Sequence, residues 1–416
     1  MRLLILSVIF GFKLIAQDTV NIMAYNLLNY NAGGANFARY YDLRTIINYR
    51  KPDVVLACEI EDVTAAQLLL DSAFNKAGVG TYTRSALIYN NNGTNTINML
   101  FYKPGKVKLK SQLSIATTLR DIAQYRVYKS FAPGDTVYAY LHMAHLKAGN
   151  SLTSTPPDEV QRLNEVTAFC NSIGSLPQNS NILFCGDLNL KSNTEAAYSK
   201  LVSSCTHTFN DPIQKEGFWN NDINFKDIHT QSTRSSSNNG CCTGATGGLD
   251  DRFDFILMNN TIKNNGNKFA YLANSYIAIG NDGNHFNLDL LNGVNTSVPA
   301  NVNQALFNMS DHLPVSAKFV FYPTPQSIKK NELNSKLKLT CAYSNGSYNA
   351  KIDSELEGWF DLKMTDVTGR NLVTKKIFIQ QGVNNIPIST SEFSSGFYNL
   401  NISNISAAAN CILLKN

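Results

Sequence analysis

Several short polar motifs in this sequence follow runs of apolar residues, and their side chains are of types that bind metal ions or transfer protons. A charged or amide side chain at the end of a buried strand is costly unless it is paired or binds a ligand. Several such strand ends together therefore indicate one shared pocket. The side chains concerned are Asn26 in AYNLLNY, Glu59 in LACEIED, His145 in MAHLKAG, Asp187 and Asn189 in FCGDLNL, Asp254 in DDRFDFIL, and Asp311 and His312 in MSDHLPV.

Three of these side chains are hard oxygen donors. Glu59 and Asp311 offer carboxylates, and Asn26 offers an amide carbonyl oxygen. Such donors suit Mg²⁺ or Mn²⁺, which keep several waters and bind substrate phosphate directly. A cation held there would offset the charge of a phosphate and of the departing oxygen. We therefore expect Mg²⁺ at this site, with Mn²⁺ or Ca²⁺ as alternatives.

The other five side chains suit acid–base work on a phosphoester. Asp187 can position or deprotonate an attacking water, with Asn189 helping to orient it. His145 and His312 can donate hydrogen bonds to phosphate oxygens, and Asp254 can hold one imidazole in the required tautomer. The set predicts a phosphoester hydrolase.

Each of these residues taken alone also has a structural interpretation. Asp254 can pair with Arg252, Asn26 can cap a turn, and His145 can be a satisfied core histidine. Independent coincidences do not readily give six such motifs, so the shared site is favoured. His142 lies three residues before His145 and would point to the opposite face of a strand, which favours a structural role. The remaining histidines are expected on the surface or in loops: His207, His229 and His285.

Apolar periodicity supplies the elements that must position these side chains. Strand-like runs and helix-like runs alternate from residue 19 to residue 322. Strands are predicted at 19–29, 53–60, 97–102, 137–146, 181–188, 253–258 and 315–322. Helices are predicted at 37–50, after the N-cap Asp62 as far as Gly78, and from Pro156-Pro157 to Gly174. The Ser/Asn/Gly-rich segment 230–248 is either a lid near the site or a disordered insertion.

In this order the motifs resemble those of the endonuclease/exonuclease/phosphatase superfamily, which includes DNase I-like nucleases, apurinic-site endonucleases, sphingomyelinases and inositol-polyphosphate phosphatases. GDLN, RFDFIL and SDHLP are the most specific parts, and the resemblance covers residues 18–323. It implies an α+β fold, a four-layer α/β/β/α sandwich of the DNase I-like type, with the site at one edge.

The resemblance also implies residue roles. Glu59 would bind the metal, with Asn26 and Asp311 close to it. Asp187 and Asn189 would act at the nucleophile, and His312, oriented by Asp254, at the phosphate. The sequence departs from the family at Cys58, where many relatives carry Gln. His145 takes a position that is His in some branches and Tyr in others, and no carboxylate that orients it is evident.

The two ends of the chain predict export. Residues 1–17 are expected to be a signal peptide, because they have a basic start, an apolar run at 3–12 and a small residue before Gln17. Residues 324–336 read as a linker, and residues 337–416 as a small β-sandwich of short strands. GFYNLNIS and ILLKN resemble the sorting domain of the type IX secretion system of Gram-negative bacteria. This resemblance implies a secreted or cell-surface protein with the secretion machinery as a partner, and it leaves open whether the domain is cleaved after export.

The net charge of the sequence does not decide which class of phosphoester is the substrate. The net charge is +5, but residues 18–323 carry equal numbers of acidic and basic side chains. A strong nucleic-acid binder usually has a clear basic excess. The leading hypothesis is an endonuclease or phosphodiesterase acting on extracellular DNA or RNA. The alternatives are a phosphatase or lipid phosphodiesterase and, in another class, a catalytically silent surface-binding module. We expect a monomer without a membrane span.

The eight cysteines include no CxxC pair and are not expected to act in catalysis. Cys58 and Cys185 stand in apolar runs, where a free thiol behaves as a small hydrophobic group. Cys241-Cys242 are expected either to pair with distant cysteines in an oxidising compartment or to stay free.

Overall fold

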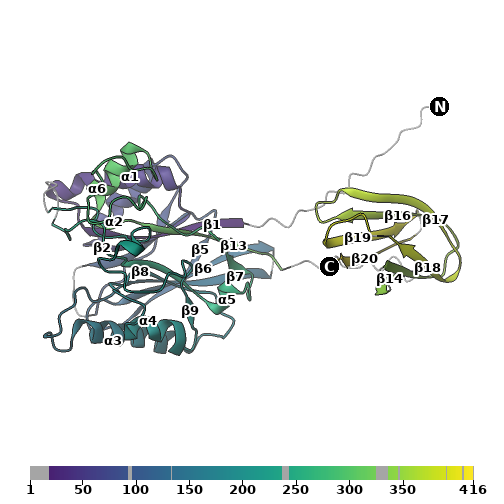
Figure 1. Ribbon diagram of the computed structural model, residues 1–416, viewed down its shortest axis with the longest axis horizontal. Helices are drawn as coiled ribbons and strands as arrows, with labels where there is room; N and C mark the ends of the chain where they lie inside the picture. Colours follow the sequence, from purple (N-terminus) through teal and green to yellow (C-terminus); the bar gives the residue numbers. More distant parts are fainter. Residues whose placement is uncertain are drawn as a thin grey trace. The chain divides into compact units, whose positions relative to one another are not determined.

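A computed structural model describes residues 18–91, 96–132, 134–236, 243–324, 336–344, 347–389, 391–404 and 407–415. The chain divides into two compact units, residues 1–324 and residues 325–416 (Figure 1). Three predicted features lie outside the described residues: the signal peptide, most of the linker, and Cys241-Cys242.

The first unit is built on two mixed β-sheets. One has the order β11-β13-β1-β2-β4-β3, with β12 also paired to β13; the other has the order β5-β6-β7-β8-β10-β9. The strands of the first sheet are β1 (Asp18–Tyr30), β2 (Val54–Ile60), β3 (Thr83–Arg84), β4 (Ile97–Tyr102), β11 (Phe269–Tyr271), β12 (Ile277–Ala278) and β13 (Val315–Phe321). Those of the second are β5 (Lys108–Ile115), β6 (Ile122–Ala132), β7 (Asp135–His145), β8 (Ile182–Asp187), β9 (Phe209–Asn210) and β10 (Asp254–Asn259).

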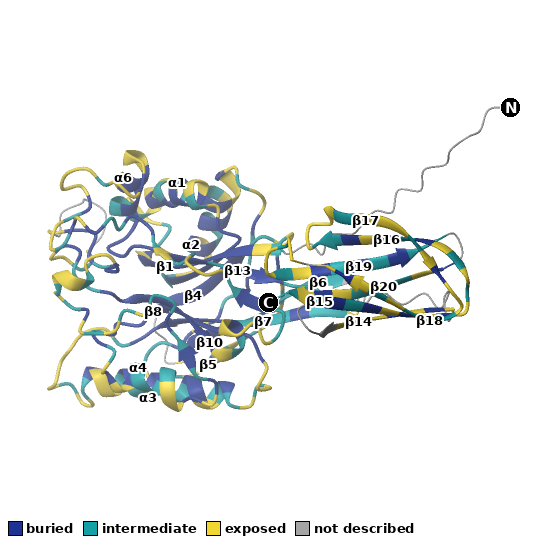
Figure 2. Ribbon diagram, turned by 45° about the vertical axis from the view of Figure 1, so that its right-hand side comes forward, coloured by how far each residue is buried: buried dark blue, intermediate teal, exposed yellow. Residues whose placement is uncertain are grey.

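Helices cover the outer face of each sheet, and buried strands lie between them (Figures 1 and 2). The first sheet carries α1 (Tyr40–Arg50), α2 (Val63–Leu68) and α6 (Ala300–Met309), and the second carries α3 (Asp158–Ile173) and α4 (Ala196–Ser199). Short helical segments complete the unit: η1 (Gly34–Arg39), η2 (Leu69–Ala73), η3 (Phe74–Lys76), η4 (Lys200–Ser204), η5 (Ile223–Phe225) and α5 (Asn260–Lys263). None of the helices in the described ranges has the length and apolarity needed to cross a bilayer.

Three apolar cores separate four layers. Leu43 and Leu306 belong to the core between the helices and the first sheet. Leu141 belongs to the core between the two sheets. Phe169 and Phe184 belong to the core between the second sheet and α3. The predicted four-layer α/β/β/α sandwich is therefore confirmed.

Two helices start at the residues that the sequence predicted. The Asp62 side chain accepts a hydrogen bond of 2.7 Å from the Ala65 N–H, which satisfies one free amide of the first turn of α2. Helix α3 begins directly after Pro157 and buries Val166, Phe169 and Ile173 on one face. That burial anchors α3 on the sheet that carries β7 and β8.

Gly186 in GDLN allows β7 and β8 to approach closely. Its φ is +129°, and a Cβ at this position would lie 2.0 Å from the Ala144 carbonyl oxygen. Only glycine fits there. The parallel register of β7 and β8 then pairs His145 with Asp187.

The second unit is a small β-sandwich with its own apolar core, as predicted. Its sheets have the orders β14-β15-β18 and β17-β16-β19-β20. The strands are β14 (Leu337–Ser344), β15 (Ser347–Ser354), β16 (Gly358–Asp366), β17 (Asn371–Ile379), β18 (Gly382–Ile388), β19 (Gly396–Ser403) and β20 (Ala408–Lys415). Strands β15 and β18 were not predicted from the sequence.

The cysteines of the described residues are structural. Disulfides join Cys170 to Cys205 in the first unit and Cys341 to Cys411 in the second. Cys58 and Cys185 are free and buried between the two sheets, as expected for small apolar side chains. Burial raises the pKa of both thiols, which disfavours the reactive thiolate.

Candidate active site

The predicted site residues meet at one edge of the two sheets. Asn26 in β1 lies beside Cys58 of the parallel strand β2, one residue before Glu59. In the other sheet, Asp187 at the end of β8 is paired with His145 of β7 and Asp254 of β10. A cleft of about 310 Å³ opens there, and it is lined by Glu59, His145, Ala148, Gly149, Asp187, Asn189, Lys191, Gln231, Ala245, Asp251, Phe253, Asp311 and His312.

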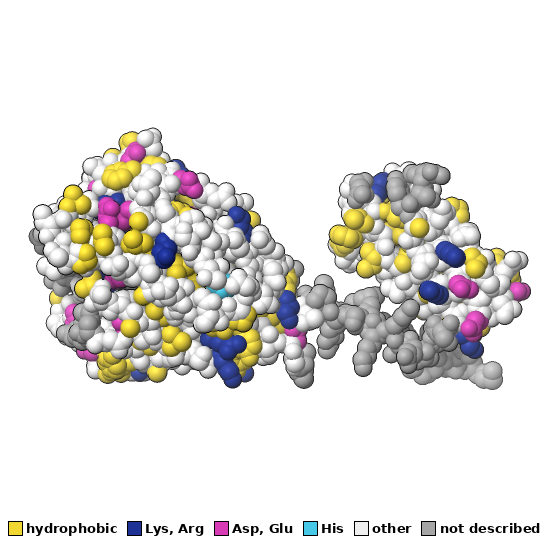
Figure 3. Space-filling view, turned by 90° about the horizontal axis from the view of Figure 1, so that it is seen from below, with side chains coloured by type: hydrophobic (Ala, Val, Ile, Leu, Met, Phe, Trp, Pro, Cys, Tyr) yellow, Lys and Arg dark blue, Asp and Glu magenta, His cyan; other side chains and the backbone are white. Residues whose placement is uncertain are grey.

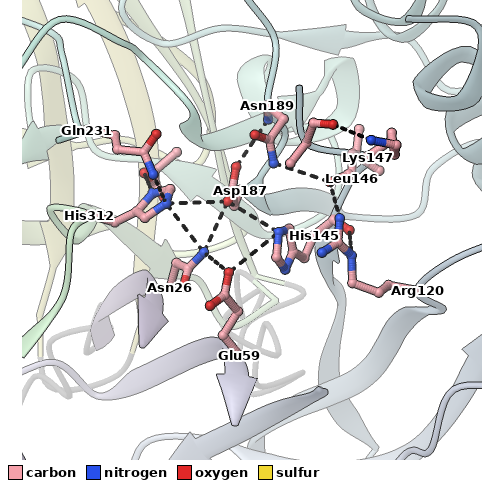
Figure 4. A network of polar contacts seen from close by, with 12 residues as sticks. Asn26, Glu59, Arg120, His145, Leu146, Lys147, Asp187, Asn189, Gln231 and His312 are labelled. Carbon is pink, nitrogen blue, oxygen red and sulfur yellow. Dashed lines mark hydrogen bonds and ion pairs between the residues drawn. The ribbon is translucent and has the colours of Figure 1, made fainter. Parts of the chain in front are cut away.

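Asp187 stands at the centre of the polar network (Figure 4). Its Oδ2 lies 3.0 Å from Asn26 Nδ2, 3.5 Å from His145 Nε2 and 3.6 Å from His312 Nε2. Its Oδ1 accepts a 3.1 Å hydrogen bond from the Asn189 N–H. Burial, reinforced by nearby carboxylates, raises the pKa of Asp187 to about 7 against the lowering effect of His312. A carboxyl group with that pKa suits proton transfer near neutral pH.

Asn26 aligns two carboxylates. Its Nδ2 donates hydrogen bonds to Glu59 Oε1 at 2.8 Å and to Asp187 Oδ2 at 3.0 Å. Its Oδ1 accepts the Leu28 N–H at 2.9 Å. The sequence predicted that the Asn26 oxygen would bind the metal, whereas in this structure the Asn26 nitrogen faces the carboxylates.

Glu59 is held in a strained backbone conformation. Its φ is +57°, in the left-handed region that a residue with a Cβ rarely adopts, and Asn189 has a φ of +51°. Such a conformation costs about 1–3 kcal/mol per residue and is concentrated at functional sites. Glu59 Oε2 accepts the Asn29 N–H at 2.9 Å, and burial raises the pKa of the Glu59 carboxyl.

His312 and Asp254 form a buried pair. His312 Nδ1 lies 2.8 Å from Asp254 Oδ2, so the Nδ1–H donates to the carboxylate. Burial by itself would lower the pKa of His312, but the charges of Asp254, Asp187 and Asp311 outweigh it and hold that pKa well above its usual range. The alternative in which Asp254 pairs with Arg252 is wrong, because Arg252 forms a bidentate ion pair with Asp211.

His145 is buried and neutral. Burial, and then the charges of Arg120 and His312, hold its pKa well below the usual range. Arg120 donates hydrogen bonds to the carbonyl oxygens of His145 and Leu146, at 3.0 and 2.7 Å. His145 Nδ1 has no hydrogen-bond partner within the described residues, which agrees with the lack of an orienting carboxylate in the sequence.

Gln231 is a site residue that the sequence did not single out. Its Nε2 lies 3.2 Å from Asp311 Oδ2 and 2.6 Å from His312 Nε2. Ala245, from the same Ser/Asn/Gly-rich segment, donates its N–H to Asp311 Oδ2 at 2.6 Å. The described part of this segment therefore borders the site. The only sequence signal was the position of Gln231 in a long loop.

The other histidines are all buried. His142 fits the predicted structural role, since its ring nitrogens lie 3.0 Å from Leu183 O and 3.0 Å from Gln124 Oε1. The remaining three lie in loops, one of the two expected locations, but they are buried there rather than on the surface: His207, His229 and His285.

The donor set of the cleft suits a divalent cation. One donor atom each from Glu59, His145 and Asp187 lie within 4.8 Å of one another. Asp311 Oδ1 is also buried and has no hydrogen-bond partner within the described residues. Buried carboxylates without partners are costly, and a cation would offset that cost. These residues thus fit a divalent cation, and His145, which the sequence assigned to the phosphate, lies beside the carboxylates.

The sequence matches no family model and no curated protein. Similar solved structures include D. rerio TDP2 complexed with single-strand DNA product, at 16% identity and a TM-score of 0.47, covering 72% of this chain and 98% of that chain. The catalytic domain of human nocturnin with a bound sulfate anion has 16% identity and a TM-score of 0.47, covering 73% and 94%. An endonuclease/exonuclease/phosphatase from Beutenbergia cavernae has 12% identity and a TM-score of 0.42, covering 95% and 100%. At these values, function must be inferred from the site itself.

Proposed function

We propose that this chain is an exported, divalent-metal-dependent phosphoester hydrolase of the endonuclease/exonuclease/phosphatase superfamily. One observation carries the proposal. The buried Asp187, with a pKa of about 7, lies within 3.6 Å of Asn26, His145 and His312. Such a cluster would be costly in a structural core but suits an acid–base site.

Each side chain has a chemical task in this proposal. Asp187 positions the attacking water and accepts its proton. His312, held by Asp254, directs Nε2 toward the phosphate and stabilises the charge that grows on its oxygens. The Asn189 N–H fixes Asp187, and the Asn189 side chain is held in turn by the Leu146 carbonyl oxygen at 3.2 Å. A divalent cation at the Glu59 carboxylate would neutralise phosphate charge.

The first substrate that we propose is a phosphodiester of extracellular nucleic acid. A second candidate, a small phosphoester or a phospholipid, is favoured by the charge of the cleft. Lys191 is the one Lys or Arg side chain among the described residues that line it, beside four carboxylates. On the face seen in Figure 3, basic side chains of the first unit are scattered and form no continuous band.

Salt dependence separates the two substrates. Binding that neutralises several phosphates weakens steeply as salt rises, whereas binding of a small phosphoester does so much less. Hydrolysis of DNA and of a chromogenic diester should therefore be compared at about 50 and 200 mM salt. A loss confined to DNA supports a polymer substrate that makes several phosphate contacts.

Export is a proposal of its own. A disulfide in each unit supports an oxidising compartment. We assign residues 337–416 as a type IX secretion sorting domain on the sequence resemblance. In the native host, a chain that lacks these residues should stay inside the cell. Its unchanged appearance in the medium contradicts this assignment.

The function is tested with a panel of phosphoesters. The full chain is assayed on DNA, RNA, a phospholipid, a chromogenic diester and a phosphomonoester, with Mg²⁺, Mn²⁺ or Ca²⁺ and with EDTA. We expect hydrolysis of at least one class, abolished by EDTA. If the chain hydrolyses none but still binds a cation, it is a silent binding module instead.

A further inference from the structure

His145 Nε2 lies at the separation expected between ligands of one ion from each of two carboxylate oxygens in the cleft. His145 Nε2 is 3.6 Å from Glu59 Oε1 and 3.5 Å from Asp187 Oδ2, and all three atoms lie within 4.8 Å of one another. Tetrahedral ligands at bonds of about 2.1 Å lie about 3.4 Å apart. The two His145 distances are close to this value, and no pair among the three atoms is more than 4.8 Å apart, so they can share a cation.

The His145 contacts are poor hydrogen bonds. N–H···O bonds in proteins have N···O distances of about 2.7–3.2 Å, so both contacts are too long. Asn26 already donates to the same two oxygens at 2.8 and 3.0 Å. Nε2 is the His145 ring atom that faces the carboxylates, and histidine binds metal ions through the lone pair of a ring nitrogen. This nitrogen can therefore bind a cation.

His312 does not offer the same opportunity. Its Nδ1 is hydrogen-bonded to Asp254 at 2.8 Å, and its Nε2 lies 2.6 Å from the Gln231 side chain. Its Nε2 contact with Asp187 is 3.6 Å, and the metal-binding cluster does not include it. His312 is therefore engaged by other partners, which makes it a matched control for His145.

We propose that His145 Nε2 is a metal ligand, and that Glu59, His145 and Asp187 together select a transition-metal ion such as Zn²⁺ over Mg²⁺. This inference concerns the metal site of the hydrolase proposed above. Imidazole nitrogen suits Zn²⁺ and other transition metals, whereas Mg²⁺ prefers an all-oxygen shell. Asn26 acts as the outer partner that orients both carboxylates. Asp187 Oδ1, which accepts the Asn189 N–H, keeps a second lone pair for the water proton.

The test measures ion binding directly. Zn²⁺ and Mg²⁺ are titrated by calorimetry into the metal-free full chain, as wild type, His145→Phe and His312→Phe. The same proteins, loaded with Mn²⁺, are examined by electron spin echo spectroscopy for coupling to a bound ¹⁴N nucleus. Thermal unfolding without metal checks that each variant folds, and His145→Gln replaces His145→Phe if the latter does not.

We expect wild type to bind Zn²⁺ about 100-fold or more tightly than Mg²⁺. His145→Phe should weaken Zn²⁺ binding by about 10- to 100-fold and Mg²⁺ binding by less than about threefold. The ¹⁴N coupling should disappear in His145→Phe and persist in His312→Phe. Coupling that survives in the folded His145 variant overturns the inference. Mg²⁺-dependent hydrolysis without any ¹⁴N coupling also overturns it but leaves the proposed hydrolase intact, whereas failure of all ions to bind overturns both.

Discussion

Replacing Asp254 with Asn keeps the shape of the side chain and removes the charge that holds His312. The hydrogen bond weakened in this way joins His312 Nδ1 to Asp254 Oδ2 at 2.8 Å, in a site where both side chains are buried; an Asn oxygen in that place still accepts the Nδ1–H but carries no charge. A hydrogen bond to a charged group contributes about 1.5–3 kcal/mol. Asp254 Oδ1 is buried without a partner in the described residues, so the new amide nitrogen finds no acceptor there. We therefore expect kcat/KM to fall by about 10- to 150-fold.

The pH profile gives a second readout of the same variant. Asp254 raises the pKa of His312, so the protonated imidazole persists to higher pH in the wild type. Without that charge the pKa falls, and the alkaline loss of activity should move to lower pH. The assay is kcat/KM for a chromogenic phosphodiester at saturating metal, measured across pH, with the exposed Asp353→Asn as the control. An Asp254→Asn enzyme with the rate and pH profile of the wild type would refute the role of this pair.

Three further changes test the fold and the cleft. Gly186→Ala places a Cβ 2.0 Å from the Ala144 carbonyl oxygen, so the free energy of unfolding measured in urea should fall by about 3 kcal/mol or more. The control is Gly105→Ala, whose Cβ meets nothing within 4 Å. Equal stabilities of the two variants would contradict this packing. Gln231→Ala removes the amide beside His312 Nε2 and should lower kcat/KM by about 10-fold without changing the melting temperature. An unchanged kcat/KM argues against a role of Gln231 in catalysis. Burial lowers the pKa of His142 from 6.5 to about 4. The free energy of unfolding should therefore be highest above pH 6.5 and fall by about 3 kcal/mol as the pH drops to about 4. His142→Gln should flatten this pH dependence, and the same dependence in both proteins would contradict the role of His142.

The convergence of the site could be predicted because it depends on local sequence. The apolar run before GDLN ends β8 at Asp187, and β7 ends at His145 in the same way. Parallel neighbours bring their carboxyl ends to one edge, so both side chains arrive together. The Asp62 cap and the proline pair before α3 likewise act within one helical turn.

Contacts made through the loop could not be predicted. Gln231 contacts His312, which is 81 residues away in the sequence, and hydrophobic periodicity does not predict such a loop contact. The Asn26 amide is turned by the Leu28 N–H, a backbone contact that composition does not reveal. Strand β5 was also missed, because its mostly exposed or half-buried residues give little apolar signal. His229 does lie in a loop, but nothing in the sequence indicates that it is buried there, with Trp219 O 2.8 Å from its Nε2.

The variant Asp187→Asn, which exchanges one carboxylate oxygen for nitrogen, tests the proposed hydrolase activity most directly. The measurement is kcat/KM of the full chain and of Asp187→Asn on the phosphoester that the wild type cleaves fastest, with metal and with EDTA. We predict metal-dependent hydrolysis that falls by at least about 100-fold in Asp187→Asn while the melting temperature is retained. Hydrolysis that survives unchanged in Asp187→Asn, or in EDTA, would contradict a metal-assisted site centred on this carboxylate.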